Sequence, residues 1–171
     1  MPQSYFLFTY YLSKSIIADV VKKSKCFYYF YCPHPLVYFY HKFTNRDFRY
    51  LSKNEIHFQP LTMEQIHKIY QKSRCILDVE HPKQTGATTR PIEMLPMKKK
   101  VITTNRKIKD FPFYRAENFH LINRDSVEID PAFFDLDYVS VPEDLVSQYS
   151  PQSFARSLME KNISTNKEIH E

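Results

Sequence analysis

The chain has 171 residues, of which 43% are hydrophobic and 25% are charged, as is typical of one globular domain with a sizeable core. Its three cysteines exclude a disulfide framework, match no zinc-binding spacing and indicate a reducing compartment. The net charge of +5 favours anionic partners such as nucleotides, polyphosphates, nucleic acid or an acidic membrane face, with a merely solubilising lysine surface as the alternative.

The N-terminal part of the chain is predicted to hold two strands and two helices. SYFLFTY (4–10) has the composition of a strand, and residues 13–25 have apolar residues at helical spacing. CFYYFYC (26–32) predicts a second strand, and LVYFYHKF (36–43) predicts a helix. The apolar run at the start is too short to span a bilayer and lacks the basic region and cleavage site of a signal peptide.

The middle of the chain is predicted to alternate a short strand, a helix and a buried strand. After a polar loop at 44–55, IHFQP (56–60) is a short strand. Thr62 and Gln65 have the spacing of a capping box, which predicts that a helix begins there. In RCILDVE (74–80), a run of apolar residues interrupted by one aspartate predicts a strand that is buried on both faces.

The rest of the chain continues the alternation. The predicted elements are a helix around 88–95, strands at 98–105 and 118–124, and a last helix that Ser150-Pro151 opens. Because strands alternate with helices, the pattern predicts an α/β fold with a doubly wound parallel sheet. Ligands of such sheets bind beyond the carboxyl ends of the strands.

The only glycine of the chain, Gly86, lies in HPKQTGATTR (81–90), directly after the predicted buried strand. Glycine tolerates positive φ and lets a ligand approach the backbone. A helix follows, and free N–H groups at a helix start favour anions. A cation, several hydroxyls and a planar donor fork accompany the glycine: Lys83, Thr85, Thr88, Thr89 and Arg90. The pattern predicts a phosphate-binding loop, with a tight turn and a helix cap as the alternative.

Residues 73–114, SRCILDVEHPKQTGATTRPIEMLPMKKKVITTNRKIKDFPFY, resemble a family of bacterial GT-B type glycosyltransferases of surface-polysaccharide and lipopolysaccharide synthesis. In that family a strand ending ILDIEHPKQTG leads into a helix with R-x-x-E-x-L, and a basic turn then precedes ITTN. The resemblance continues through NFHLINRD (118–125) and is weak over 1–60. It implies a single Rossmann-like domain over 1–160, equivalent to the C-terminal half of a GT-B enzyme, with a polar tail over 161–171.

In GT-B enzymes the C-terminal half binds the nucleotide-sugar donor. By resemblance, the loop from His81 to Arg90 faces the donor diphosphate and sugar, and Glu93 holds the ribose hydroxyls. The next strand ends at the same predicted edge in Thr103, Thr104 and Asn105, whose alternative role is to cap the following segment. The predicted donor-binding residues are His81, Lys83, Gln84, Thr85, Gly86, Thr88, Arg90, Glu93, Thr103, Thr104 and Asn105.

The resemblance implies transfer of a sugar from a nucleotide sugar to a glycan or lipid-linked acceptor, in the cytoplasm or peripherally at the inner face of the cytoplasmic membrane. GT-B chemistry takes place between two halves, and we expect the acceptor-binding half to be missing, through truncation or because a separate chain supplies it. The isolated chain is then expected to bind donor but to transfer little sugar, and no catalytic residue is assigned.

Neither a cofactor nor a metal is expected: HExxH is absent, although Asp135-Leu136-Asp137 has the spacing of a DxD motif. Two other functions stay open from the composition alone. The first is a basic nucleic-acid-binding module, against which the dispersed basic residues argue, and the second is a purely structural module that contacts a partner. Pro91 and Pro96 depart from the family pattern, although proline is tolerated in a first helical turn and after a helix end.

Overall fold

The computed structural model describes residues 27, 29–44, 52–80, 88–123, 128–157 and 159. The strand predicted at 4–10, the helix predicted at 13–25 and the tail at 161–171 lie outside these residues. So does most of the predicted phosphate loop, from 81 to 87.

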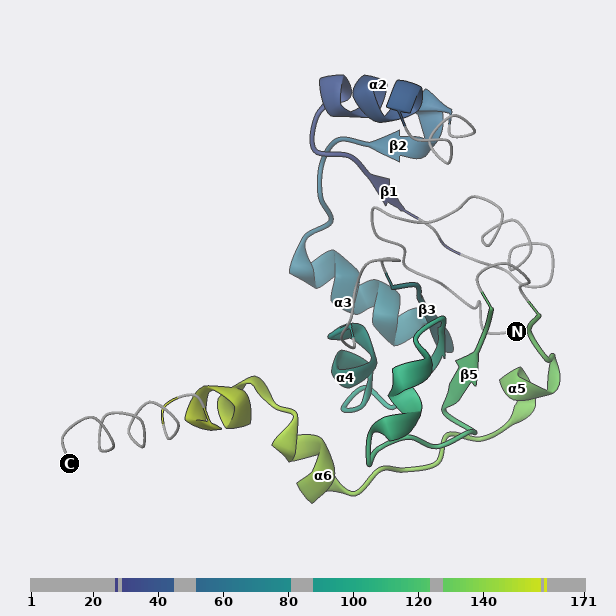
Figure 1. The fold of residues 1–171 in the computed structure, drawn as a ribbon, viewed down its shortest axis with the longest axis vertical. Helices are drawn as coiled ribbons and strands as arrows, with labels where there is room; N and C mark the ends of the chain where they lie inside the picture. The colour runs from purple at the N-terminus through teal and green to yellow at the C-terminus, as the bar shows by residue number, and fades with distance from the viewer. Residues whose placement is uncertain are drawn as a thin grey trace.

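The first described elements form a small parallel unit, drawn in purple and blue in Figure 1. Its elements are β1 (Phe30–Tyr31), α2 (Pro35–Thr44), the short 3₁₀ helix η2 (Lys53–Glu55) and β2 (Ile56–His57). β1 pairs with β2 in parallel, and α2 covers them by packing Tyr38 against Cys32 and Ile56. The helix predicted at 36–43 is therefore confirmed, and of the described residues in the strand predicted at 26–32, Phe30 and Tyr31 are in strand conformation.

The central part of the chain forms a three-stranded parallel sheet in the order β3-β4-β5. Its strands are β3 (Cys75–Asp78), β4 (Lys100–Thr103) and β5 (Phe119–Leu121). The register places Asp78 opposite Thr103, which in turn lies opposite Leu121. Three strands that the sequence predicts are thus present and parallel, and their carboxyl ends lie side by side.

Helices precede and connect these strands. α3 (Met63–Lys72) begins with the predicted capping box: the Thr62 hydroxyl accepts from the Gln65 backbone, and the Gln65 side chain accepts from the Thr62 backbone at 2.8 Å. α4 (Arg90–Met94) connects β3 to β4 and tolerates Pro91 in its first turn. The 3₁₀ helix η3 (Arg106–Asp110) follows β4 directly.

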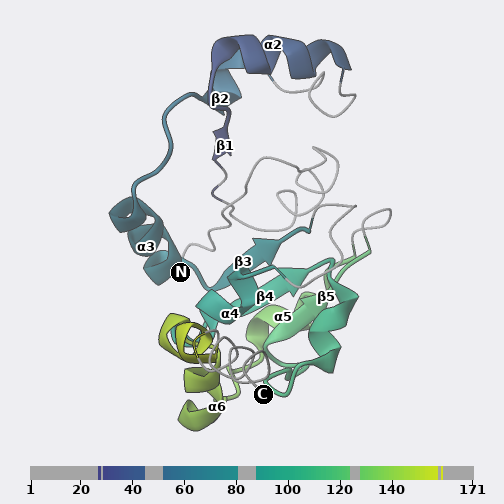
Figure 2. The ribbon, with the colours of Figure 1, turned by 60° about the vertical axis from the view of Figure 1, so that its left-hand side comes forward.

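Both faces of the three-stranded sheet are covered, as predicted for the strand at 74–80. Alternate residues of the strands point to opposite faces, so Leu77 and Ile102 lie in one cluster while Ile76 and Val101 lie in the other. The first cluster is closed by α5 (Ala132–Asp135) through residues that include Phe133. The second contains side chains of α3, α4, η3 and α6 (Glu143–Gln148). Figure 2 shows these helices around the sheet.

A buried asparagine attaches the segment between α5 and α6 to the start of β5. Asn118 is fully buried, and its amide donates to the Val139 carbonyl at 2.7 Å while its carbonyl accepts from the Val139 N–H at 2.9 Å. This pair of bonds substitutes for a strand pairing that the segment does not form. After α6, residues 151–157 are helical, as predicted from Ser150-Pro151.

The described strands form two sheets, which differs from the single doubly wound sheet that the pattern predicts. β1 and β2 are limited to two paired residues each, Phe30 with Ile56 and Tyr31 with His57. Prolines follow closely at 33 and 60, and a proline has no N–H with which to continue a ladder. What the described residues show is a mixed fold of helices and parallel strands.

A lysine occupies the left-handed position in the turn after α4. Lys98 has φ 51°, the Lys99 N–H donates to the Met94 carbonyl, and the Lys98 N–H donates to the Leu95 carbonyl. These two bonds are those of a Schellman turn, in which glycine is the usual left-handed residue. Pro96 precedes this position and does not supply it, so an exposed lysine adopts the strained conformation.

Replacing Lys98 with glycine is expected to raise the free energy of unfolding by about 1 kcal/mol, because glycine lacks the Cβ that makes positive φ costly. Denaturant unfolding measures the change. Lys98→Ala is the matched control, since it removes the charge but keeps the Cβ. An equal gain in both variants would mean that charge, not backbone conformation, limits stability at this turn.

Candidate functional site

The candidate site lies where β3 and β4 end, and its centre is a buried carboxylate. Asp78, the last residue of β3, is 2% exposed. Its Oδ2 accepts a hydrogen bond of 2.5 Å from the Thr88 hydroxyl and one of 3.3 Å from the Thr103 hydroxyl. Thr88 comes just before α4, and Thr103 ends β4. One carboxylate therefore joins the ends of two strands to the start of the connecting helix.

The residues after β4 continue this network along the edge. The Thr103 hydroxyl also accepts from the Asn105 backbone N–H at 3.0 Å, and the buried Asn105 side chain caps η3 by accepting from the Lys107 N–H. The Thr104 hydroxyl accepts from the Glu80 N–H at 3.3 Å. Thr103 and Asn105 thus have the capping role that was the alternative to ligand contact, whereas Thr104 is partly exposed.

Arg90 is a cation that acts on this network. Its guanidinium hydrogen-bonds the Tyr70 hydroxyl and acts electrostatically on Asp78. Burial raises the pKa of Tyr70, and the neighbouring Arg90 opposes that rise. Glu93, one turn further along α4, is exposed and close enough to raise the pKa of both Tyr70 and Asp78. The start of α4 therefore presents a cation and a carboxylate beside the buried aspartate.

The Asp78 carboxyl has an altered affinity for its proton. Burial raises its pKa above the ordinary 3.8, while the hydroxyls of Thr88 and Thr103 and the charge of Arg90 act in the opposite direction. The folded chain therefore retains the proton at pH values where the unfolded chain has lost it. This retained proton stabilises the folded chain relative to the unfolded chain. Its contribution is complete below pH 3.8 and is lost as the pH rises through the raised pKa of Asp78.

Asp78→Asn is expected to become more stable relative to the native chain as the pH rises from 4 to 7. Asparagine keeps an oxygen that accepts from both threonines but has no charge to desolvate. Urea unfolding at the two pH values measures this difference. Asp110→Asn, which changes an exposed aspartate on η3, is the matched control. A loss of stability of Asp78→Asn relative to the native chain between pH 4 and pH 7 would contradict the proposed cost of ionising Asp78.

An open cavity of about 400 Å³ adjoins this edge. It is lined by Glu80, Thr104, Asn105, Arg106, Lys107, Ile122 and Asn123. A second cavity of about 650 Å³ shares Arg106, Ile122 and Asn123 with it and extends along β5 to His120 and Asp130. Together they form a polar channel over the carboxyl ends of β4 and β5. Its lining combines two cations, Arg106 and Lys107, with three carboxylates, those of Glu80, Glu128 and Asp130, so the channel can contact both charged and hydroxyl groups of a ligand.

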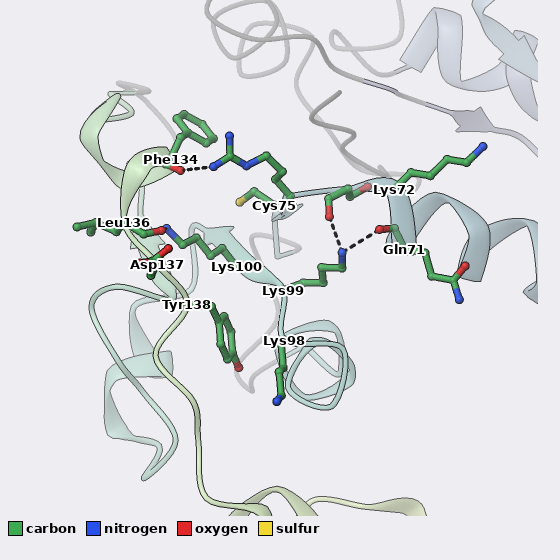
Figure 3. Close-up of a pocket in the computed structure, with 12 residues that line it drawn as sticks. Gln71, Lys72, Cys75, Lys98, Lys99, Lys100, Phe134, Leu136, Asp137 and Tyr138 are labelled. Atoms are coloured by element: carbon green, nitrogen blue, oxygen red, sulfur yellow. Dashed lines mark hydrogen bonds between the residues drawn. The ribbon is translucent and has the colours of Figure 1, made fainter. Parts of the chain in front are cut away.

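A third cavity, of about 340 Å³, lies at the opposite, amino-terminal edge of the sheet and is lined by several basic residues (Figure 3). The Lys99 ammonium donates to the Gln71 and Ser73 carbonyls at the end of α3, at 2.9 and 2.8 Å. The Lys100 ammonium donates to the Phe133 carbonyl at 2.6 Å and to the Leu136 carbonyl. Burial lowers the pKa of both lysines.

The arrangement of these lysines is that of helix caps. Cations near the last carbonyls of a helix stabilise its C-terminal end, and Lys99 and Lys100 do this for α3 and α5 respectively. Figure 3 shows that the side chains of Lys98, Lys99 and Lys100 point in different directions, so they do not converge on one ligand. We therefore place the candidate site at the carboxyl edge.

The structure brings six of the predicted site residues to one edge and leaves five undescribed. Thr88, Arg90, Glu93, Thr103, Thr104 and Asn105 lie at the ends of β3 and β4 or at the start of α4. His81, Lys83, Gln84, Thr85 and Gly86 lie outside the described residues. Sequence reasoning missed Asp78, Glu80 and Tyr70. The one available signal was the aspartate in the apolar run CILDV, since a buried strand rarely ends on an unpartnered charge.

Within the described ranges, no group of three or more histidine, cysteine, aspartate or glutamate side chains is placed to hold a metal ion. In the same ranges, every helix falls short of the length and apolar character that a membrane-spanning helix needs. Comparisons with protein-family models, with curated proteins and with solved structures give no match for this chain.

Proposed function

We propose that the chain is the donor-binding half of a GT-B type glycosyltransferase, and that its Rossmann-like sheet binds a nucleotide sugar at the carboxyl edge of β3 and β4. The observation that carries the proposal is the 2.5 Å hydrogen bond between Thr88 and Asp78. Residues 81–87 connect Glu80, just after β3, to Thr88, just before α4. Both ends of the predicted phosphate loop therefore lie at the edge where such sheets bind their ligands.

The chemistry of the edge suits a nucleoside diphosphate. Arg90 offers a planar donor fork for phosphate oxygens, and the sequence of the loop adds Lys83 and the glycine position Gly86. Glu93, exposed on α4, can accept from two ribose hydroxyls. Asp78 is too deeply buried to contact the donor, so we assign it and Thr103 the role of holding the start of α4 in place.

The proposal extends to the partners of the reaction. A glycan or lipid-linked acceptor would face the donor across a second half, supplied by a separate N-terminal glycosyltransferase chain, in lipopolysaccharide or capsular polysaccharide synthesis. Acceptors of this kind are made at the cytoplasmic side of the inner membrane, so we propose a cytoplasmic location with peripheral contact to that membrane. Positioning the acceptor accounts for a large part of the rate of such a transfer, and the isolated half is expected to transfer little sugar.

Calorimetric titration with uridine, guanosine, adenosine and thymidine diphosphates, each beside its nucleoside, tests the donor site. We expect one diphosphate to bind and its nucleoside to bind far more weakly. Glu93→Gln is expected to weaken binding of that diphosphate by a factor of roughly 5 to 150, which corresponds to about 1–3 kcal/mol for hydrogen bonds that lose a charged acceptor. Glu143→Gln, which changes an exposed glutamate on α6, is the control. Binding of none of the four diphosphates would overturn the proposal.

A further inference from the structure

The helix α2 exposes four large apolar side chains to solvent. Leu36, Phe39, Tyr40 and Phe43 are 71%, 46%, 64% and 77% exposed. Their spacing of i, i+3, i+4 and i+7 places them on one stripe of the helix. We call these four residues the α2 stripe. An isolated exposed leucine is ordinary, but four contiguous large apolar side chains indicate a surface that is covered in function.

The opposite side of α2 is already used by the fold. Tyr38 is 1% exposed and packs with Cys32 and Ile56, and the half-buried Val37 joins them. In Figures 1 and 2, α2 lies at one end of the described part of the chain, with β1 and β2 between it and the other labelled helices and strands. The α2 stripe therefore faces away from the sheet that carries the candidate site, and a partner can reach it without covering that site.

The charge around the stripe is positive. α2 contains no acidic residue, and its last turn carries His41 and Lys42. Among the described residues of 27–60, the lysines are Lys42 and Lys53, and the acidic residue is Glu55. Lys53, in η2, is exposed. A partner with anionic groups around an apolar interior matches this combination better than another basic protein surface does.

The size of the stripe also restricts the partner. At these exposed fractions, the four side chains present on the order of 500 Å² of accessible surface. A stable protein interface buries about 800 Å² on each partner, more than the stripe alone offers. A lipid surface needs no such area, because a few side chains can enter the boundary between headgroups and acyl chains. Tyr40 suits that boundary, since its ring is apolar and its hydroxyl is polar.

We propose that the α2 stripe docks this chain onto an anionic lipid surface, with Leu36, Phe39 and Phe43 entering the acyl boundary and the neighbouring cations contacting the headgroups. The inference rests on the peripheral location proposed above and names the surface responsible for it. It does not depend on nucleotide binding, because the stripe and the carboxyl edge of β3 and β4 are separate surfaces.

Co-sedimentation of the full chain with vesicles tests the proposal. We expect binding to vesicles of phosphatidylglycerol and phosphatidylcholine, weaker binding to phosphatidylcholine alone, and weakening by salt. The double variant L36S/F43S is expected to lose about tenfold or more of the affinity, because its two most exposed apolar side chains can no longer insert. Both positions are exposed, so the fold should tolerate the change, which circular dichroism verifies. Phe154→Ser, at a phenylalanine that is 66% exposed outside α2, is the matched control.

Equal vesicle binding by the native chain and L36S/F43S would overturn the proposal, as would a native chain that binds no anionic vesicle. A native dimer that L36S/F43S converts to a monomer, seen by light scattering, with no vesicle binding by either, would assign the stripe to a second copy instead. Calorimetry with the nucleoside diphosphates on the same preparations separates the two proposals. Vesicle binding without diphosphate binding contradicts only the donor site, and the reverse contradicts only the lipid surface.

Discussion

Replacing Phe113 with alanine is expected to lower the free energy of unfolding by about 3–5 kcal/mol, the usual cost of truncating a fully buried phenylalanine. Phe113 is 0% exposed and lies in the cluster that joins the sheet to α4 and α6. Its ring is 5.1 Å from that of Phe111, 5.9 Å from that of Phe119 and 4.9 Å from that of Tyr149. Truncation to alanine leaves a cavity between the rings of Phe111, Phe119 and Tyr149.

Equilibrium unfolding in guanidinium chloride measures this change. Phe154→Ala is the matched control, because the same substitution at an exposed phenylalanine should change the stability by less than about 0.5 kcal/mol. If Phe113→Ala lowers the free energy of unfolding no more than Phe154→Ala does, the cluster around Phe113 is not the core that stabilises α4 and α6.

The second large effect is expected on ligand binding. Arg90→Ala should weaken nucleoside diphosphate binding by a factor of roughly 10 to 150, which corresponds to about 1.5–3 kcal/mol for a hydrogen bond to a charged group. Arg90 is the first residue of α4, so its guanidinium lies where the predicted phosphate loop ends. Its removal also takes away a positive charge that acts on Asp78, which makes the edge less favourable to an anion.

Two variants distinguish this role from a structural one. Tyr70→Phe removes the hydroxyl that Arg90 bonds but leaves the guanidinium, and it should reduce the affinity only slightly. Lys109→Ala removes an exposed cation on η3 and controls for net charge. If Tyr70→Phe weakens binding as much as Arg90→Ala does, the bond between the two side chains matters more than a contact of Arg90 with phosphate.

The sequence was most informative where local signals and burial agree. The capping box at Thr62 and Gln65 predicted the start of α3, because two side chains and two backbone groups satisfy one another without help from the rest of the fold. The continuous apolar run in RCILDVE predicted a strand covered on both faces, and its residues alternate between two clusters as a buried parallel strand requires.

Other features depend on contacts that no local pattern contains. α5 and α6 are too short to show helical periodicity and depend on tertiary contacts such as that of Phe133 with the sheet. The division of the described strands into two sheets depends on which strands pair with each other, and the paired residues lie far apart in the sequence. The roles of Asp78 and Thr103 appear only once β3 and β4 are in register, because 25 residues separate them in the chain.

Nuclear magnetic resonance of the isotope-labelled chain during titration with the four nucleoside diphosphates tests the location of the donor site most directly. We expect one diphosphate to shift the backbone amide signals of Glu80, Thr88, Arg90 and Thr104, with little change around Lys98, Lys99 and Lys100 at the opposite edge of the sheet. Shifts concentrated at those lysines, or no shift with any of the four diphosphates, would contradict it.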